Sequence, residues 1–215
     1  MLKLYGEGRG VRVAWLLEEM GIPYELRSVD LLNDLEKDTE FLTVNPGGFI
    51  PALIDGDVTM VESVAIMQYI IARYGPTGLA PDPSDPAFAT YLQFLHLGEA
   101  GLATLVNVTV ATRILAPPDE QENFGSQHAI RSFRNRMKLV KRQLETSLFI
   151  AGDKFTAADI SVSYALALAK RGAGLPLGEP ETSYLKRMEA RPAFQRMLNT
   201  FTGTKKFYES VPLDA

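Results

Sequence analysis

The sequence predicts a protein of two domains, an α/β domain followed by an all-α helical bundle domain. Short apolar strands and amphipathic helices alternate over residues 1–76, proline and glycine are concentrated in residues 77–86, and apolar residues recur at helical spacing over 87–215. A chain of 215 residues has room for two domains of roughly 100 residues, each with its own core. We therefore assign 1–76 to the first domain, 77–86 to a linker and 87–215 to the helical domain.

The first domain has the element order βαβαββα. An apolar strand is expected at Leu2–Tyr5, and apolar residues at i, i+3, i+4 and i+7 from Val13 to Met20 predict a helix that ends at Gly21. The remaining elements are expected as a strand at 24–28, a helix at 35–43, strands at 52–54 and 58–60, and a helix with a buried stripe at 67, 70, 71 and 74. This order is typical of a thioredoxin-like domain, and the first crossover should be right-handed.

Helices account for the rest of the chain. Two long helices, expected at 86–115 and 121–148, would form the spine of a bundle. Thr156 as N-cap and Asp159 three residues later predict the start of another helix, and both are expected to be structural. Pro192 is expected at the first position of a helix near the C-terminus.

The composition excludes several classes of protein. A net charge of −4 and a pI near 5.3 argue against general nucleic-acid binding, which needs a basic face. The absence of cysteine excludes disulfides and protein-thiol chemistry and is typical of a reducing compartment, and two histidines without cysteine argue against a metal site. No apolar run of about 18 residues suggests a membrane span, and Met1 leads directly into the first strand without a signal peptide. The expected location is the cytoplasm.

The most informative stretch begins with Asn-Pro-Gly-Gly at residues 45–48. Pro51 cannot donate to a sheet ladder, so it must lie at the first residue or edge of the following strand. If its peptide bond is cis, the N–H and C=O groups of Ile50 point outward, unpaired, where an extended peptide could bind. A hairpin then leads to a helix that starts near Glu62 and Ser63, and its first N–H groups favour an anion.

The run Asn-Pro-Gly-Gly-Phe-Ile-Pro-Ala-Leu, followed by Glu-Ser, resembles the glutathione-binding half of the cytosolic glutathione S-transferase family. The resemblance extends over most of the chain. It implies that Ile50, before a cis Pro51, pairs with the cysteinyl backbone of glutathione. It also implies that Glu62 binds the γ-glutamyl ammonium group, while Ser63 and the helix N–H groups bind the carboxylate. Members of the family often carry a lysine where this chain has Phe49, and that lysine binds the glycyl carboxylate of glutathione. In this chain the role would pass to Lys37 or an arginine.

The group that stabilises the thiolate of glutathione should lie just after the first strand. Tyr5 carries the only hydroxyl there, in a Tyr-x-x-x-Arg-Gly pattern similar to tyrosine-type members, although a tyrosine that ends a strand is usually packed inward. The following helix is more similar to serine-type members, whose hydroxyl would fall near Gly8. The other candidates to stabilise the thiolate are Arg9, Arg12 and the backbone N–H groups of Gly8 to Gly10.

The first long helix of the bundle resembles the helix that lines the hydrophobic substrate pocket in bacterial-type transferases. The residues expected in this pocket are Leu102, Leu105, Val106 and Thr109, although core packing would also explain their spacing. Glu99 is a candidate to reach the amine of glutathione in a neighbouring subunit, and His96 is expected to be packed or interfacial. The basic residues at 131–142 are expected to form a solvated face.

The sequence therefore predicts a transferase, in a cytoplasmic homodimer, that uses glutathione as co-substrate and needs no metal. It would conjugate glutathione to a small hydrophobic electrophile, or use it to cleave or isomerise one, as in detoxification. The alternative is a non-catalytic protein of the same fold that binds glutathione or hydrophobic ligands. Thiol–disulfide exchange is contradicted by the absence of cysteine. Neither a membrane nor a nucleic acid is expected as a partner.

Overall fold

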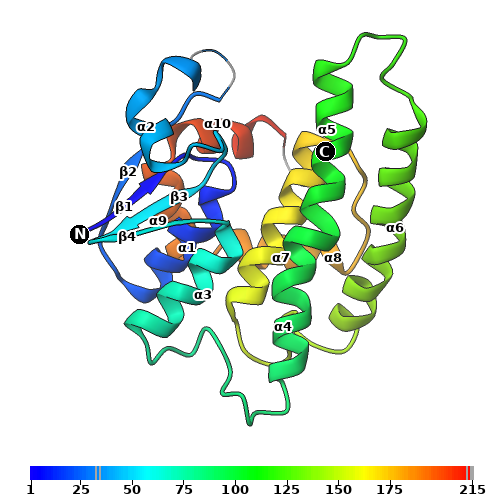
Figure 1. Ribbon diagram of the computed structural model, residues 1–215. Helices are drawn as coiled ribbons and strands as arrows, with labels where there is room; N and C mark the ends of the chain where they lie inside the picture. Colours follow the sequence, from blue (N-terminus) through cyan, green and yellow to red (C-terminus); the bar gives the residue numbers. More distant parts are fainter. Residues whose placement is uncertain (32, 34, 212, 214–215) are drawn as a thin grey trace. The chain divides into compact units, whose positions relative to one another are not determined.

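The computed structural model describes residues 1–31, 33, 35–211 and 213, and they form two compact units (Figure 1). The first unit comprises Met1–Thr77 together with Arg191–Phe207. The second comprises Gly78–Ala190 and the described residues from Tyr208 onward. We had expected residues 191–207 in the helical domain, whereas their contacts place them in the first unit.

The first unit is built on a four-stranded mixed sheet of order β2-β1-β3-β4. Its strands are β1 (Leu2–Tyr5), β2 (Tyr24–Arg27), β3 (Ala52–Asp55) and β4 (Val58–Val61). β1 pairs parallel with β2 and antiparallel with β3, and β3 pairs antiparallel with β4. The predicted βαβαββα order is confirmed, with helices α1 (Gly10–Met20), α2 (Thr39–Val44) and α3 (Ser63–Tyr74).

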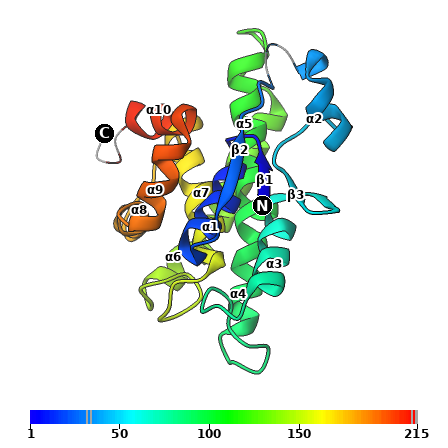
Figure 2. The ribbon, with the colours of Figure 1, turned by 90° about the vertical axis from the view of Figure 1, so that its left-hand side faces the viewer.

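Successive side chains of β1 point to opposite faces of the sheet and pack in two different layers. Leu2 and Leu4 are buried on one face, while Tyr5 packs on the other face with Phe41 of α2 and Ala52. Figure 2 shows α2 on one side of the strands and α1 on the opposite side. The expected helix at 35–43 is divided into a 3₁₀ turn, η1 (Leu35–Lys37), and α2, because the side chain of Asp38 caps α2.

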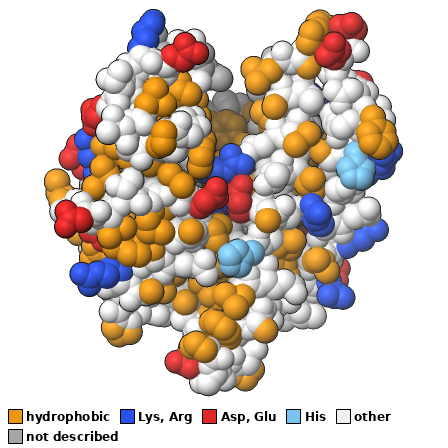
Figure 3. Space-filling view, in the orientation of Figure 1, with side chains coloured by type: hydrophobic (Ala, Val, Ile, Leu, Met, Phe, Trp, Pro, Cys, Tyr) orange, Lys and Arg blue, Asp and Glu red, His pale blue; other side chains and the backbone are white. Residues whose placement is uncertain are grey.

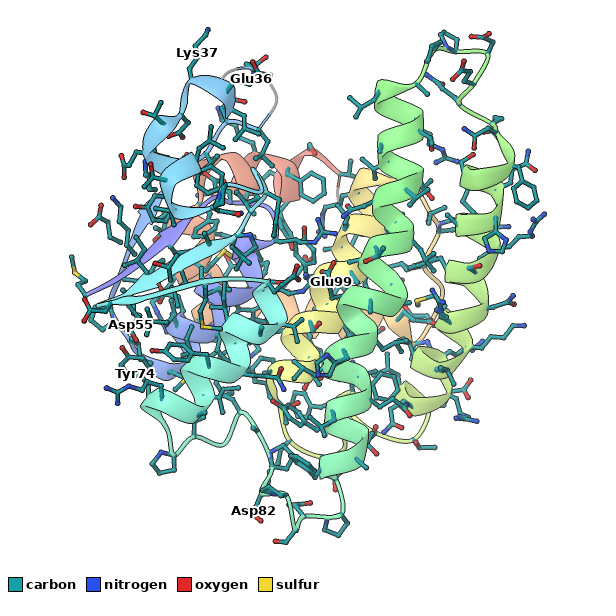
Figure 4. All side chains as sticks on the ribbon, in the orientation of Figure 1. Glu36, Lys37, Asp55, Tyr74, Asp82 and Glu99 are labelled. Carbon is teal, nitrogen blue, oxygen red and sulfur yellow. The ribbon has the colours of Figure 1, made fainter. Side chains whose placement is uncertain are left out.

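The β3–β4 hairpin is fastened to the end of α3 through Asp55. The hydroxyl groups of Tyr69 and Tyr74 donate to the same carboxylate oxygen, Oδ2 of Asp55, at 2.8 Å and 2.7 Å. Figure 4 shows Asp55 and Tyr74 close together at this edge of the unit. These contacts fix α3 relative to the hairpin that precedes it.

Residues from the C-terminal part of the chain complete the first unit. The helix α9 (Pro192–Thr200) packs on α1, with the rings of Trp15 and Phe194 edge-to-face at 4.8 Å. Arg191 forms a bidentate ion pair with Glu19 of α1 at 2.6 Å and 2.9 Å. The helix α10 (Thr202–Ser210) follows directly. Pro192 occupies the predicted first turn of α9.

The second unit is helical. Its segments are α4 (Phe88–His96), η2 (Leu97–Ala103), α5 (Thr104–Leu115), α6 (Phe124–Leu144), α7 (Ala157–Ala167), η3 (Leu168–Gly172) and α8 (Glu181–Glu189). The first long helix was expected without interruption, but η2 is π-helical. At Gly98, in η2, a Cβ atom would lie 2.6 Å from the carbonyl carbon of Ser161, so only glycine fits where η2 meets α7.

The start of α7 is buried and fully capped. Thr156 and Asp159 form the predicted capping box, and the Asp159 carboxylate also accepts hydrogen bonds from the backbone N–H of Ile150 at 2.8 Å and the hydroxyl of Tyr184 at 2.9 Å. Burial raises the pKa of Asp159 to about 6, even though each of these hydrogen bonds acts to lower it.

The segment Phe88–Arg113 is the one described helix that is long and apolar enough to cross a membrane, judged by length and composition alone. An apolar run of this length is not predicted from the sequence. Core helices of soluble proteins pass the same test, and 44% of the most apolar window of this helix is buried inside the structure. The helix is therefore weak support for a membrane-spanning role.

Candidate functional site

The candidate site begins at the turn before β3. The peptide bond between Ile50 and Pro51 is cis, and Pro51 is buried immediately before the strand. The buried side chain of Asn45 holds the turn, since its Nδ2 donates to the carbonyl of Phe49 at 2.6 Å and its Oδ1 accepts from the N–H of Gly47 at 3.0 Å. Within the described part of the chain, the main-chain groups of Ile50 form no hydrogen bond.

The loop between β1 and α1 lies against this turn. Gly6 has a φ of 86°, and a Cβ atom there would lie 2.6 Å from Cβ of Ile50. A Cβ atom at Gly8 would lie 3.3 Å from Cδ1 of Ile50, and one at Gly10 would lie 3.8 Å from Cβ of Pro51. Glycine therefore lets the loop approach the residue before the cis proline, with no side chain between them.

The N-terminus of α3 lies beside the same turn because of the register of the hairpin. Ala52 pairs with Val61, so Ile50 precedes one member of this pair by two residues and Ser63 follows the other by two. Glu62 has φ 72° and ψ 104°, a region that non-glycine residues rarely adopt, and its exposed side chain forms no capping hydrogen bond. Such strained residues cluster at functional sites.

Ser63 accepts a hydrogen bond from a buried arginine. Nη1 of Arg12, in α1, donates to Oγ of Ser63 at 3.2 Å, and the Arg12 side chain is completely buried. A buried guanidinium next to the positive end of a helix dipole creates a positive potential. The position suits a carboxylate.

Tyr5 is less suited to the role that the sequence suggested. Its ring is 2% exposed and packs 6.0 Å from the ring of Phe41, and its hydroxyl donates to Oε1 of Glu40 at 3.2 Å. A hydrogen bond from Lys3 is the main cause of the lowered pKa of Glu40, and the hydrogen bond from Tyr5 acts in the same direction. The Tyr5 proton is thus directed to a carboxylate on α2, which favours the packing alternative.

Other groups at the start of α1 are better placed. The N–H groups of Gly10, Val11 and Arg12 donate to carbonyl groups within the turn. The N–H of Gly8 has no acceptor within the described residues, and Arg9 is half-buried at the N-cap position. The loop therefore offers a donor N–H at Gly8 close to Ile50, and Arg9 follows it in sequence.

The two residues considered for the glycyl end of glutathione are both exposed. The side chain of Phe49 is 41% exposed next to the cis proline. Lys37 lies in η1, and Figure 4 shows its side chain pointing outward from the first unit.

The predicted pocket residues lie mostly in the core. Leu102, Val106 and Thr109 are fully buried, and only Leu105 is half-buried. This placement favours core packing, the other explanation of their spacing. On the same helix the exposed positions include Thr104, Val108 and Leu115, which the sequence analysis did not select. They recur at intervals of four and seven residues, and that spacing could have identified a second face.

Glu99 and His96 lie near the junction of α4 and η2. Glu99 is half-buried, and its Oε1 accepts from the hydroxyl of Thr104 at 3.4 Å (Figure 4). His96 is exposed, so of the packed and interfacial positions expected for it, the packed one is not observed in this chain.

Basic residues on α6 form the solvated face that the sequence predicted. Figure 3 shows Lys and Arg side chains gathered along the edge of the second unit over α6. The exposed residues are Arg131, Arg134, Arg136, Lys138, Lys141 and Arg142.

Two functional candidates were missed from the sequence. Asn45 was treated only as part of an Asn-Pro turn, yet its side chain fixes the turn at both ends. Glu7 was passed over between two glycines, and its carboxylate accepts from the N–H of Thr204 at 2.6 Å. No sequence signal links residues 7 and 204. The residues that the structure describes contain no group of three or more His, Cys, Asp or Glu side chains that could hold a metal ion.

Comparison with known proteins identifies the fold and the family. Residues 1–72 match the family model described as the N-terminal domain of glutathione S-transferase. Glutathione S-transferase 3 of Zea mays is 31% identical over 207 residues, which cover 91% of this chain and 92% of the relative. Glutathione S-transferase 3 of Schizosaccharomyces pombe is 27% identical over 177 residues, or 76% and 71% of the two chains.

Solved structures agree with this. A glutathione transferase from Methylococcus capsulatus superposes with a TM-score of 0.80 at 26% identity, covering 93% of this chain and 98% of the other. A glutathione transferase from Phanerochaete chrysosporium, in complex with oxidized glutathione, gives a TM-score of 0.79 at 26% identity, covering 92% and 94%. The thioredoxin-like domain followed by a helical domain is the fold of these enzymes. This chain therefore belongs to the glutathione S-transferase family.

Proposed function

We propose that the protein binds glutathione in its first unit and transfers it to small hydrophobic electrophiles. One observation carries the proposal: the open main chain of Ile50 lies, through the Ala52–Val61 pair, beside the N-terminus of α3, where buried Arg12 holds Ser63. An extended peptide with a carboxylate at one end matches a free peptide edge next to a positive helix end. Oxidized glutathione is bound in the related structure from Phanerochaete chrysosporium.

Each end of glutathione has a proposed partner. The N–H and C=O groups of Ile50, exposed by the cis Pro51, pair with the cysteinyl residue. Glu62 binds the γ-glutamyl ammonium group, and Ser63 with the first N–H groups of α3 binds its carboxylate. Phe49 covers the peptide from the solvent side.

Catalysis requires that the thiol of glutathione lose its proton near neutral pH. Lowering a thiol pKa by two units corresponds to about 2.7 kcal/mol of differential stabilisation, which one or two hydrogen bonds or a nearby cation can supply. We assign this role to the N–H of Gly8 and to Arg9, because Tyr5 donates to Glu40, and we assign to Arg12 the support of Ser63. The thiolate sulfur then bonds to the electrophilic carbon, and the leaving group departs with the electron pair.

Binding is tested by calorimetric titration with glutathione and with cysteinylglycine, which lacks the γ-glutamyl group. We expect glutathione to bind and cysteinylglycine to bind at least about tenfold more weakly. Ser63→Ala should reduce this preference, whereas Ser84→Ala, in a turn of the second unit, should not change it. Absence of heat from glutathione at millimolar concentration would overturn the proposal.

A non-catalytic binding protein is the second candidate, favoured by the engagement of Tyr5 with Glu40. A turnover assay with an activated aryl halide separates the two functions. A catalyst releases halide in proportion to enzyme, and a binding protein does not. If Tyr5→Phe loses most of the rate while glutathione binding is unchanged, our assignment of the thiolate to Gly8 and Arg9 is wrong.

We further propose that the protein works in the cytoplasm as a homodimer and that Glu99 reaches the glutathione amine of the neighbouring subunit. Leu105 is the one predicted pocket residue exposed enough to contact the electrophile. Light scattering after size-exclusion chromatography measures the oligomeric state. A monomer at micromolar concentration would remove the proposed role of Glu99.

A further inference from the structure

Glu7 connects the loop between β1 and α1 to a segment near the other end of the chain. Its Oε2 accepts from the backbone N–H of Thr204 at 2.6 Å, and its Oε1 accepts from the hydroxyl of Ser28 at 3.4 Å. Thr204 lies in the first turn of α10, where N–H groups have no partner inside the helix. Glu7 therefore caps α10 from a distant part of the sequence, with a charge that suits the positive helix end.

The C-terminal segment fits the loop closely at two further points. A Cβ atom at Gly203 would lie 3.0 Å from Oε2 of Glu7. A Cβ atom at Gly10 would lie 3.8 Å from Cε1 of Phe201, whose side chain is fully buried. The loop thus contacts the turn at Ile50 through Gly6 and Gly8, and it contacts residues 201–204 through Glu7 and Gly10.

This second contact bears on the chemistry of the site. A loop of three glycines in five residues has a high conformational entropy of its own, and donors that must meet a thiolate gain from being held in advance. Glu7 directly precedes Gly8, whose N–H we assign to the thiolate.

We propose that Glu7 is a positioning residue: by binding the N-terminus of α10 it fixes the glycine loop, so that residues 201–204 support the glutathione site. The inference rests on the proposed glutathione binding. It adds that glutathione binding depends on residues 201–204. This segment is remote in sequence and contacts neither Ile50 nor α3 in the contacts described above.

The test compares Glu7→Ala with Glu7→Gln. The amide oxygen of glutamine still accepts from the N–H of Thr204, whereas alanine offers no acceptor. Glu25→Ala, an exposed carboxylate on β2, is the matched control. Three quantities are measured for each: hydrogen exchange of the amides at residues 6–10, the affinity for glutathione, and the pH midpoint of thiolate formation by ultraviolet difference spectra.

We expect Glu7→Ala to accelerate exchange in the loop, weaken glutathione binding about tenfold and raise the thiol midpoint by about one pH unit, with the far-ultraviolet dichroism unchanged. Glu7→Gln should recover most of the loop protection and affinity, and Glu25→Ala should match the wild type. A thiol midpoint and loop exchange that are unchanged in Glu7→Ala would overturn the proposal.

Gly203→Ala provides a second route that leaves Glu7 in place. The added methyl group would push the Glu7 carboxylate by a few tenths of an ångström and weaken its hydrogen bond to the N–H of Thr204, so the same changes are expected with smaller size. If Glu7→Ala does not fold, the measurements on Gly203→Ala test whether Glu7 positions the loop. If the wild type binds no glutathione, the proposed function fails, while the exchange of residues 6–10 still shows whether Glu7 positions the loop.

Discussion

Two helix N-termini in this protein, those of α3 and α7, have opposite local designs. At α7, Thr156 and Asp159 satisfy the backbone donors, and the Asp159 carboxylate is completely buried. At α3, Glu62 has a left-handed backbone conformation and provides no capping hydrogen bond, and its side chain is exposed. One helix end is closed by side chains of its own segment, and the other has no side-chain cap.

The presence or absence of a side-chain cap distinguishes a structural helix N-terminus from a candidate functional one. A cap that satisfies the backbone N–H donors stabilises the fold and leaves no donor for a ligand. A strained, uncapped terminus lowers stability, and it persists where the surrounding structure imposes it. We therefore expect changes at α7 to act on stability and changes at α3 to act on glutathione binding.

The largest effect is expected from Asp159→Ala. It removes the acceptor of four hydrogen bonds, from the N–H of Ile150, the N–H and hydroxyl of Thr156, and the hydroxyl of Tyr184. Leaving such donors buried without a partner should cost about 4 kcal/mol of unfolding free energy, measured by urea denaturation. Asp153→Ala, at an exposed position of the same loop, is the control and should change little. An equal loss in both variants would contradict the contrast.

The pH dependence of the same cap gives the next largest effect. Burial raises the pKa of Asp159 to about 6, so between pH 4 and 6 the folded state retains a proton that the unfolded state has lost. The contribution of this carboxyl to unfolding free energy is therefore greatest at low pH and falls as pH rises, by about 3 kcal/mol in total. Asp159→Asn lacks this titration.

Urea unfolding of the wild type and Asp159→Asn at pH 4, 5 and 7 measures this change. The stability difference between the two proteins should become less favourable to the wild type as pH rises. A difference that grows with pH would mean that the hydrogen bonds keep the carboxylate ionised.

At α3, Glu62→Gln should weaken glutathione binding by about 2 kcal/mol, because the exposed carboxylate no longer neutralises the γ-glutamyl ammonium group. Its unfolding free energy should stay within about 0.5 kcal/mol of the wild type. Titration calorimetry and urea unfolding on the same preparations give both numbers. Glu36→Gln, on the exposed turn η1, serves as the control for loss of one surface charge (Figure 4).

The smallest effect expected is a gain. Glu62→Gly relieves a φ of 72° and should raise the unfolding free energy by about 1 kcal/mol, while glutathione binding is weakened. Thermal and urea unfolding measure the gain. Lower stability in Glu62→Gly would show that the conformation at the start of α3 is not strained.

The sequence was sufficient for the features that depend on neighbouring residues. The strand and helix periodicity, the cap at Thr156 and Asp159, and the Pro51 turn with Glu62 and Ser63 are all encoded within a few positions. Contacts between distant segments were not accessible. The pairing of Tyr5 with Glu40 and of Glu7 with Thr204 depends on side-chain packing, for which a single sequence carries no signal.

The membership of residues 191–207 in the first unit has a consequence for synthesis. A ribosome delivers the chain from its N-terminus, so the sheet and α1 emerge long before α9 exists. Until then, Trp15 lacks its contact with Phe194, and Glu19 lacks its ion pair with Arg191. The unit whose strands are translated first is therefore completed only after residues 78–190 of the second unit have been translated.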